Sequence, residues 1–141
     1  MISSELLFLI NINKLQSVIA RKFDSLSVHG LGFNDFVILY VLYTSSESKM
    51  RRIDLAEKIG LTASGVTRLL NPLEKIGLVA RETNERDARV SYVVITSGGK
   101  RIFEEAKATA ENITKEILPS KKSKSLKIIS ELLFELGGNI Q

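Results

Sequence analysis

The stretch that decides the fold is residues 53–70, which read IDLAEKIGLTASGVTRLL. It divides into two short helical patterns that meet at Gly60, where a residue without a Cβ tolerates the left-handed backbone of a tight turn. Ala56 is small where the two helices would cross, and Val66 supplies an apolar contact from the second helix. The pattern predicts a helix-turn-helix, a unit whose second helix is placed in a DNA groove.

The apolar positions of this unit predict which helix faces are buried. They are Ile53, Leu55 and Ile59 in the first helix, and Val66, Leu69, Leu70, Leu73 and Ile76 in the second. Thr62 or Ser64 is expected to cap the second helix, and Gly77 is expected to end it. Because Pro72 has no amide donor and crowds the preceding turn, we expect either a kink after Leu70 or an end of the DNA-facing part there.

Two strand-like runs follow the second helix. They are residues 78–83 and 90–95, and the charged segment NERDAR, residues 84–89, separates them. Such a pair predicts a β-hairpin with a charged tip. A hairpin directly after a helix-turn-helix is the wing of a winged-helix domain, and an arginine at its tip can reach into a minor groove.

The residues before this unit predict two more helices. A wide apolar stripe from Leu6 to Leu26, opened by Ser3 or Ser4 as a cap, predicts a long first helix. Residues 36–43 are uninterruptedly apolar, a pattern that fits a buried strand as well as a buried helix. We expect a helix there because Asn34 is placed to cap it and because the neighbouring segments are helical.

The residues after the hairpin predict two further helices. Thr96 is expected to cap the first of them, and Pro119 to end it. Its apolar positions at helical spacing are Ile102, Phe103, Ala106, Ala110, Ile113 and Ile117. A last amphipathic helix carries Leu126, Ile129, Leu132, Leu133 and Leu136, and Gly137-Gly138 closes it.

The expected fold class is therefore mainly α with a small β-hairpin wing (α+β), in one domain over residues 1–141. A winged-helix DNA-binding lobe would occupy residues 33–101, and dimerisation helices would occupy 1–28 and 102–141. Apolar stripes this wide at both ends of a 141-residue chain would leave apolar surface exposed in a monomer. A homodimer would cover that surface.

Composition excludes several classes of function. The chain has no cysteine and one histidine, which rules out disulfides, thiolate metal sites and thiol nucleophiles and leaves His29 without an identifiable catalytic partner. We expect no enzymatic activity, no cofactor and no metal. The first residues do not resemble a secretory leader, and no apolar run is long enough for a membrane span, so we expect a cytoplasmic protein without a membrane partner.

Positive charge gathers around the predicted DNA-binding lobe. The segment from Lys49 to Arg101 holds 11 of the 20 Lys and Arg residues but 6 of the 16 Asp and Glu residues, a net charge of +5. The rest of the chain has a net charge of −1, so the whole has +4. A mixed-charge window is often only a solvated surface, but beside a helix-turn-helix it indicates nucleic-acid binding.

Taken together, these motifs resemble the MarR family of transcriptional regulators, and the resemblance covers nearly the whole chain in order. The residues that carry it are Ala56, Gly60, Val66, Thr67, Arg68, the run LEKIGLV at 73–79, Asp87-x-Arg89 and Thr96-x-x-Gly99. The resemblance implies a homodimer with intertwined first and last helices, two lobes on one face of a palindromic operator, and often a small effector pocket. Pro72 and the doubled Gly98-Gly99 are departures from the family pattern.

Residues for DNA contact follow from helical spacing and from the hairpin. Ser64, Thr67, Arg68 and Asn71 can share one exposed helix face, since they lie three or four residues apart. Arg68 is the strongest candidate, because a guanidinium can pair with guanine O6 and N7 or hold a phosphate. At the wing, Arg86 and Arg89 are expected to contact the DNA backbone or minor groove. Asp87 is expected to brace an arginine, because phosphate repels a carboxylate.

An effector pocket for a small aromatic or amphipathic molecule is a further expectation. Phe23, Phe36, Tyr40 and Tyr43 could line it at the junction of the lobe and the dimerisation helices, although core packing explains the same residues equally well. The preferred function is a dimeric repressor of a promoter with an inverted-repeat operator. Two alternatives are a non-specific architectural DNA binder and a winged helix that binds another protein. Steep salt dependence without sequence preference would favour the first alternative, and weak, salt-insensitive DNA binding would favour the second.

Overall fold

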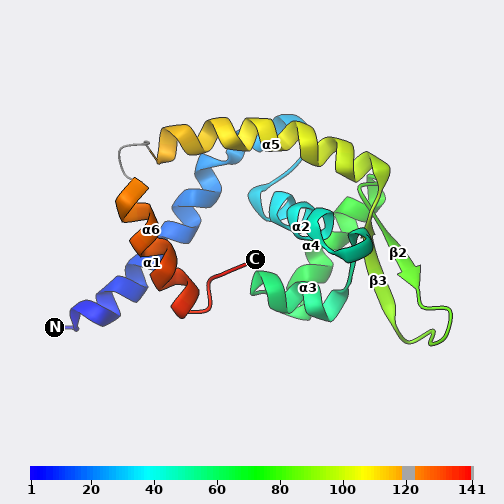
Figure 1. Ribbon diagram of the computed structural model, residues 1–141, viewed down its shortest axis with the longest axis horizontal. Coiled ribbons are helices and arrows are strands. Elements are labelled where there is room, and N and C mark those ends of the chain that lie inside the picture. Colours follow the sequence, from blue (N-terminus) through cyan, green and yellow to red (C-terminus); the bar gives the residue numbers. More distant parts are fainter. Residues whose placement is uncertain (119–122, 141) are drawn as a thin grey trace.

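The computed structural model describes residues 1–118 and 123–140, and it is mostly helical (Figure 1). The α-helices of these residues are α1 (Ser4–Lys22), α2 (Phe33–Thr44), α3 (Arg52–Ile59), α4 (Ala63–Lys75), α5 (Ser97–Ile117) and α6 (Ser123–Glu135). Short 3-10 helices, η1 (Asp24–His29) and η2 (Ser46–Ser48), join some of them. The strands are β1 (Lys49–Arg51), β2 (Val79–Thr83) and β3 (Ser91–Ile95). The mainly helical class with a small β-sheet is thereby confirmed.

The sheet has three antiparallel strands in the order β1-β3-β2. The predicted hairpin is β2 and β3, whose register pairs Val79 with Ile95 and Thr83 with Ser91. Strand β1 was not predicted, and it pairs Met50 with Val93 along the other edge of β3. A run of three residues is too short to show a two-residue period, so only its pairing with β3 identifies it as a strand.

Helix α2 forms the centre of the core, which settles the ambiguity of its sequence in favour of a helix. Its buried residues are Ile38, Leu39, Val41 and Leu42. Around them lie buried side chains of α3, α4, the sheet and α5, among them Leu55, Val66, Leu70, Val93 and Phe103. The core thus joins the helix-turn-helix, the sheet and the long helix α5.

Polar side chains accept backbone amides at the starts of four of the helices. The Ser3 hydroxyl accepts a hydrogen bond from the Leu6 amide at 3.1 Å, and the Thr62 hydroxyl accepts one from the Gly65 amide at 3.0 Å. The predicted Asn34 cap is wrong. The Asp35 carboxylate accepts the Gly32 amide at 2.8 Å instead, and Asn34 lies inside the first turn of α2.

Two of the expected buried positions are wrong. Ile53 is 62% exposed, because it precedes the buried Leu55 by two residues, which places it roughly 200° around the helix. Ile76 is 59% exposed, because it caps α4 and lies beyond the last helical turn. The remaining expected positions of both helices are buried or half-buried.

Helix α4 continues through Pro72 to Lys75, so the helix itself does not end at the proline. Gly77, with φ 80°, turns the chain from α4 into β2, as expected. The expected end of α5 at Pro119 lies outside the described residues.

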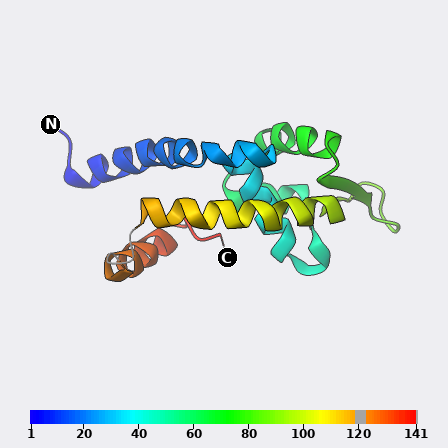
Figure 2. The same cartoon turned by 90° about the horizontal axis from the view of Figure 1, so that it is seen from above.

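Helix α5 connects the two parts of the molecule. At one end it packs on α2 and the sheet, and towards the other it runs out to the region of α1 and α6 (Figure 1, Figure 2). Neither α1 nor α6 contains a fully buried residue, although both are rich in apolar side chains. Across the described residues, we find no helix with the length and apolarity needed to span a membrane.

Candidate nucleic-acid interface

The candidate interface begins with the turn between α3 and α4. Gly60 has φ 75°, and the Leu61 amide donates to the Ala56 carbonyl at 2.9 Å, which closes the turn. Buried Leu55 and Ala56 of α3 pack in the same core as Val66 of α4. This packing fixes one face of α4 inside the lobe and leaves the opposite face to solvent.

The exposed face of α4 carries the predicted contact residues. Ser64, Arg68 and Asn71 are exposed, while Thr67 is half-buried. Arg68 forms no hydrogen bond or ion pair with the described part of the chain, so its guanidinium can bind an external anion. The Ser64 hydroxyl lies 3.2 Å from the Thr62 hydroxyl, beside the cap of the helix.

The hydroxyl of Thr67 is occupied within the protein. It donates to the Ala63 carbonyl at 3.0 Å and accepts a hydrogen bond from Nη1 of Arg52 at 3.1 Å. A hydroxyl has one proton, so Thr67 has no donor left for a phosphate in this arrangement. Sequence reasoning missed Arg52, because no spacing rule connects the first residue of α3 with the second turn of α4.

The wing tip is shaped by two short polar side chains. The Asn84 side-chain oxygen accepts the backbone amides of Arg86 at 2.8 Å and Asp87 at 3.3 Å, which turns the chain. The Asp87 carboxylate accepts the Arg89 amide at 3.0 Å, its Nε at 3.1 Å and its Nη2 at 3.3 Å. Hydrogen bonds from Arg89 hold the pKa of Asp87 below its ordinary value of 3.8, and those from its side chain have a larger effect than the one from its backbone amide.

Both wing arginines remain available to a partner. The Arg89 side chain is 91% exposed even though Asp87 orients it, and Arg86 is exposed as well. The structure therefore brings Arg86, Asp87 and Arg89 together at one end of the hairpin, away from α5 (Figure 1).

Two other basic residues of the lobe are neutralised by carboxylates. Nζ of Lys49 lies 2.7 Å from Glu82 and 3.3 Å from Glu47, and 4.9 Å above the ring of Tyr92. The hydrogen bond to Glu82 is the main reason that the pKa of Lys49 is raised. Arg81 lies 3.3 Å from Glu74. These pairs tie the base of the wing to β1 and α4, a role that the count of charges along the sequence did not reveal.

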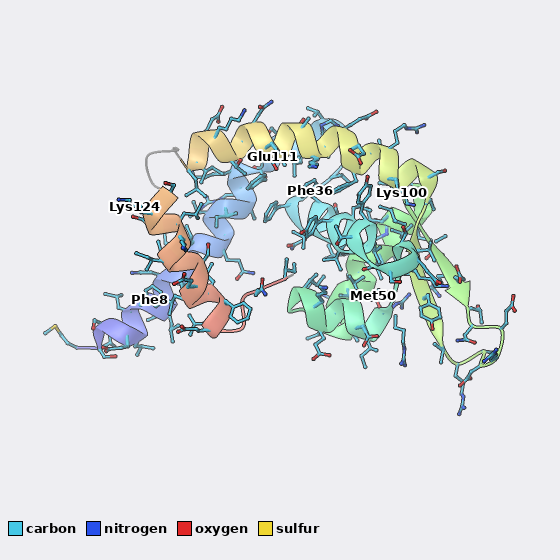
Figure 3. The ribbon with its side chains drawn as sticks, viewed as in Figure 1. Phe8, Phe36, Met50, Lys100, Glu111 and Lys124 are labelled. Atoms are coloured by element: carbon cyan, nitrogen blue, oxygen red, sulfur yellow. The ribbon has the colours of Figure 1, made fainter. Side chains whose placement is uncertain are left out.

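The predicted effector residues are packed against other aromatic rings. Phe23 stacks on Phe33 with ring centroids 4.3 Å apart. The other three lie around Phe103 of α5, at 5.2 Å for Phe36, 6.3 Å for Tyr40 and 4.7 Å for Tyr43, and Figure 3 shows Phe36 between α2 and α5. The Tyr43 hydroxyl also donates to Glu104, a hydrogen bond that raises the pKa of Tyr43. The structure brings Phe36, Tyr40 and Tyr43 together but places Phe23 in a separate aromatic pair.

The single histidine joins two elements near these rings. Nε2 of His29, in η1, lies 2.8 Å from the Thr109 hydroxyl of α5. Within the described residues, no three His, Cys, Asp or Glu side chains gather in a way that could hold a metal ion.

Comparisons with known proteins agree with the fold. The sequence model of the MarR family matches residues 33–91, which include α2, the helix-turn-helix and most of the wing. The uncharacterized HTH-type transcriptional regulator YdgJ of Bacillus subtilis is 28% identical over 138 residues, which cover 98% of this chain and 82% of that protein.

Solved structures share the fold over nearly the whole chain. Sco3205, a MarR family transcriptional regulator from Streptomyces coelicolor solved in complex with DNA, has a TM-score of 0.79 at 20% identity and covers 96% of this chain and 89% of its own. The organohalide-sensing regulator RdhR-CbdbA1625, solved with bound 2,4-dichlorophenol, has a TM-score of 0.80 at 19% identity, with coverages of 96% and 82%. At these identities the likeness shows the winged-helix fold together with its terminal helices.

Proposed function

This chain belongs to the MarR family of transcriptional regulators, and on that premise we propose that it is a homodimeric repressor that binds an inverted-repeat operator through α4 and the wing. The observation that carries this proposal is Arg68. It lies on the exposed face of α4, and its guanidinium has no partner in the described chain. A free guanidinium on a helix that fits the major groove is suited to guanine O6 and N7 or to a phosphate.

The other contacts follow from the same placement of α4. Ser64 and Asn71 flank Arg68 on the exposed face, one turn before and one turn after it. Asn71 is suited to adenine, and the Ser64 hydroxyl to a phosphate or a base edge. Arg86 and Arg89 at the wing tip bind the neighbouring backbone or minor groove, where closely spaced phosphates concentrate negative potential. The similar regulator Sco3205 was solved in complex with DNA, which supports a DNA-binding role for this fold.

Dimerisation accounts for the apolar surfaces of α1 and α6. Exposed apolar residues on α1 include Leu6, Leu7, Phe8, Leu9 and Ile10, and those on α6 include Leu126, Ile129, Leu132 and Leu133. A hollow between the two helices is lined mainly by Phe8, Leu9, Leu132 and Leu136, of which Figure 3 labels Phe8. A second copy with intertwined terminal helices buries these surfaces. Its two-fold axis places the α4 helices about 34 Å apart, one turn of DNA.

A small aromatic or amphipathic molecule releases the repressor in this proposal. The 2,4-dichlorophenol bound to RdhR-CbdbA1625 supports an aromatic ligand. Such a ligand competes with the ring contacts that join Phe36, Tyr40 and Tyr43 to Phe103 of α5. In the dimer, the two DNA-binding lobes would differ in spacing between the operator-bound and the released state. The ligand changes operator affinity only to the extent that it binds one of these two states more tightly than the other. The chain acts as a binding protein without catalysis, in the cytoplasm where bacterial and archaeal DNA is found.

Fluorescence-anisotropy titrations test the proposal. The full-length protein is titrated onto labelled DNA from its own upstream intergenic region and onto a shuffled duplex, each at several salt concentrations. We expect the upstream duplex to bind at least about tenfold more tightly, or about 1.4 kcal/mol, and Arg68→Ala to remove the difference.

Equal affinity for both duplexes would contradict a specific regulator. The salt dependence then separates the other functions. A steep slope indicates an architectural DNA binder, and weak, salt-insensitive binding indicates a protein-interaction module.

A further inference from the structure

Arg52 links the two helices of the helix-turn-helix. It is the first residue of α3, it is half-buried, and its Nη1 donates to the Thr67 hydroxyl in the second turn of α4. Thr67 is the immediate neighbour of Arg68 and lies three residues after Ser64. The guanidinium of Arg52 is therefore held at the flank of the exposed face of α4.

Arg52 is poorly satisfied within the protein. Its Nε is buried and has no hydrogen-bond partner, and the residue forms no ion pair with the described part of the chain. Of its five N–H donors, one is used in a hydrogen bond to a described residue. A half-buried charge without a counter-charge adds little to the stability of a fold, and an apolar side chain of similar length would fill the same space without leaving a donor unpaired.

A partner outside the chain would explain the unused donors on the Nη nitrogens, which, unlike Nε, are not buried without a partner. In helix-turn-helix complexes the first helix crosses the DNA backbone while the second enters the major groove, so the start of α3 faces phosphates when α4 is bound. Lys49 and Arg81 show that this lobe pairs cations with carboxylates where they serve the fold. The lobe supplies no such carboxylate to Arg52.

We propose that Arg52 is a phosphate-binding residue, which Thr67 holds beside α4 so that its charge meets the DNA backbone as the recognition helix enters the groove. This inference rests on the proposed DNA-binding function. It gives Thr67 a positioning role, because its hydroxyl orients Arg52 and has no donor left for DNA.

The test measures how binding depends on salt concentration for Arg52→Met and Arg52→Gln. Methionine keeps an unbranched apolar chain and removes every donor, whereas glutamine keeps an amide donor and removes the charge. Both variants should bind the upstream and shuffled duplexes about tenfold more weakly, by the same factor for each, because phosphate contacts carry no sequence information. The slope of log K against log salt should become less steep by about 1.

Lys100→Gln serves as the control for charge alone, because Lys100 is an exposed residue in the first turn of α5, on the side of the lobe away from α3 (Figure 3). The slope of log K against log salt for this variant should equal that of the wild type. Urea unfolding of Arg52→Met should show stability equal to or higher than that of the wild type, since an unpaired buried donor is removed.

An unchanged salt slope in both Arg52 variants would overturn the phosphate assignment, whatever happens to stability. That failure is distinct from failure of the proposed function, which shows in the wild type itself as equal affinity for the two duplexes. If the wild type discriminates and the Arg52 variants keep its slope, only the role of Arg52 is lost.

Discussion

The basic residues of the lobe fall into two groups that the sequence does not separate. Lys49 and Arg81 form ion pairs with glutamates, and Arg89 is held by Asp87 while its side chain stays exposed. Arg52 and Arg68 have no carboxylate partner in the described chain. The net charge of the segment indicated a nucleic-acid partner, but only the positions of the carboxylates show which cations are left for DNA.

The sequence also does not show that the Thr67 hydroxyl is already paired within the fold. Helical spacing correctly places it on the same side of α4 as Ser64 and Asn71. Its hydrogen bond to Arg52 joins residues 15 positions apart, through the packing of α3 on α4. Contacts of this kind depend on tertiary structure and leave no periodic pattern in the sequence.

Gly99 is required by close packing at the start of α5. A Cβ at this position would lie 2.1 Å from the Leu78 carbonyl oxygen and 2.7 Å from Cγ1 of Ile95. We predict that Gly99→Ala lowers the free energy of unfolding by about 2 kcal/mol, because a backbone oxygen cannot move aside cheaply. Urea denaturation checks this value.

The neighbouring glycine provides the matched control. A Cβ at Gly98 would have its nearest neighbours at 3.7 Å, which is ordinary contact. Gly98→Ala should leave stability unchanged or raise it by up to about 1 kcal/mol. Equal losses for the two variants would show that the approach of Leu78 and Ile95 to α5 is looser than described.

The Asp87–Arg89 contact predicts how the wing responds to pH. Because Arg89 lowers the pKa of Asp87 below 3.8, the interaction is complete at neutral pH and is lost as the pH falls through the lowered pKa. An NMR titration of the Asp87 carboxyl carbon should give a midpoint below 3.8, and Arg89→Gln should move the midpoint upward. A midpoint that is the same in both proteins would mean that the contact does not persist in solution.

At the scale of elements, the sequence predicts helices and hairpins well where the spacing of apolar residues agrees with the residues that cap or end an element. The turn at Gly60, the end of α4 at Gly77 and the cap at Thr96 all appear in the structure. Strand β1 was missed because its identity depends on pairing with β3, which lies about 40 residues away. At Pro72 the helix does not end, because α4 continues through it to Lys75.

Thr96 joins two elements and gives a test at this scale. Its hydroxyl accepts the Gly99 amide at 3.0 Å, which caps α5, and donates to the Gly77 carbonyl at 2.6 Å, which fixes the turn before the wing. Thr96→Val should lower the free energy of unfolding by about 1 to 2 kcal/mol. Thr96→Ser, which keeps the hydroxyl, should stay within about 0.5 kcal/mol of the wild type. A serine variant as unstable as the valine variant would show that the methyl group, and not the hydroxyl, matters here.

For the whole molecule, the distribution of apolar surface points to a second copy of the chain. The lobe buries its own core, while α1 and α6 leave most of their apolar side chains exposed. Leu132→Lys should shift the protein towards the monomer and weaken operator binding, because each half-site is then bound separately. Analytical ultracentrifugation over a range of concentrations measures the shift.

Ile76→Lys is the control for added charge at an apolar position. Ile76 is 59% exposed at the C-terminal end of α4, in the lobe and outside the α1 and α6 surfaces. This variant should keep the assembly state of the wild type. If Leu132→Lys behaves in the same way, α6 does not form the dimer interface.

Hydroxyl-radical footprinting of the upstream region, with wild type and Arg68→Ala side by side, tests the central claim most directly. It reports both the use of α4 in the groove and the two-fold arrangement of the lobes. The account predicts two protected segments, related by inverted symmetry and centred about one helical turn apart, that disappear in the variant. A single or uniform protection, or a footprint that Arg68→Ala leaves intact, would contradict a dimeric operator-specific repressor that reads DNA through Arg68.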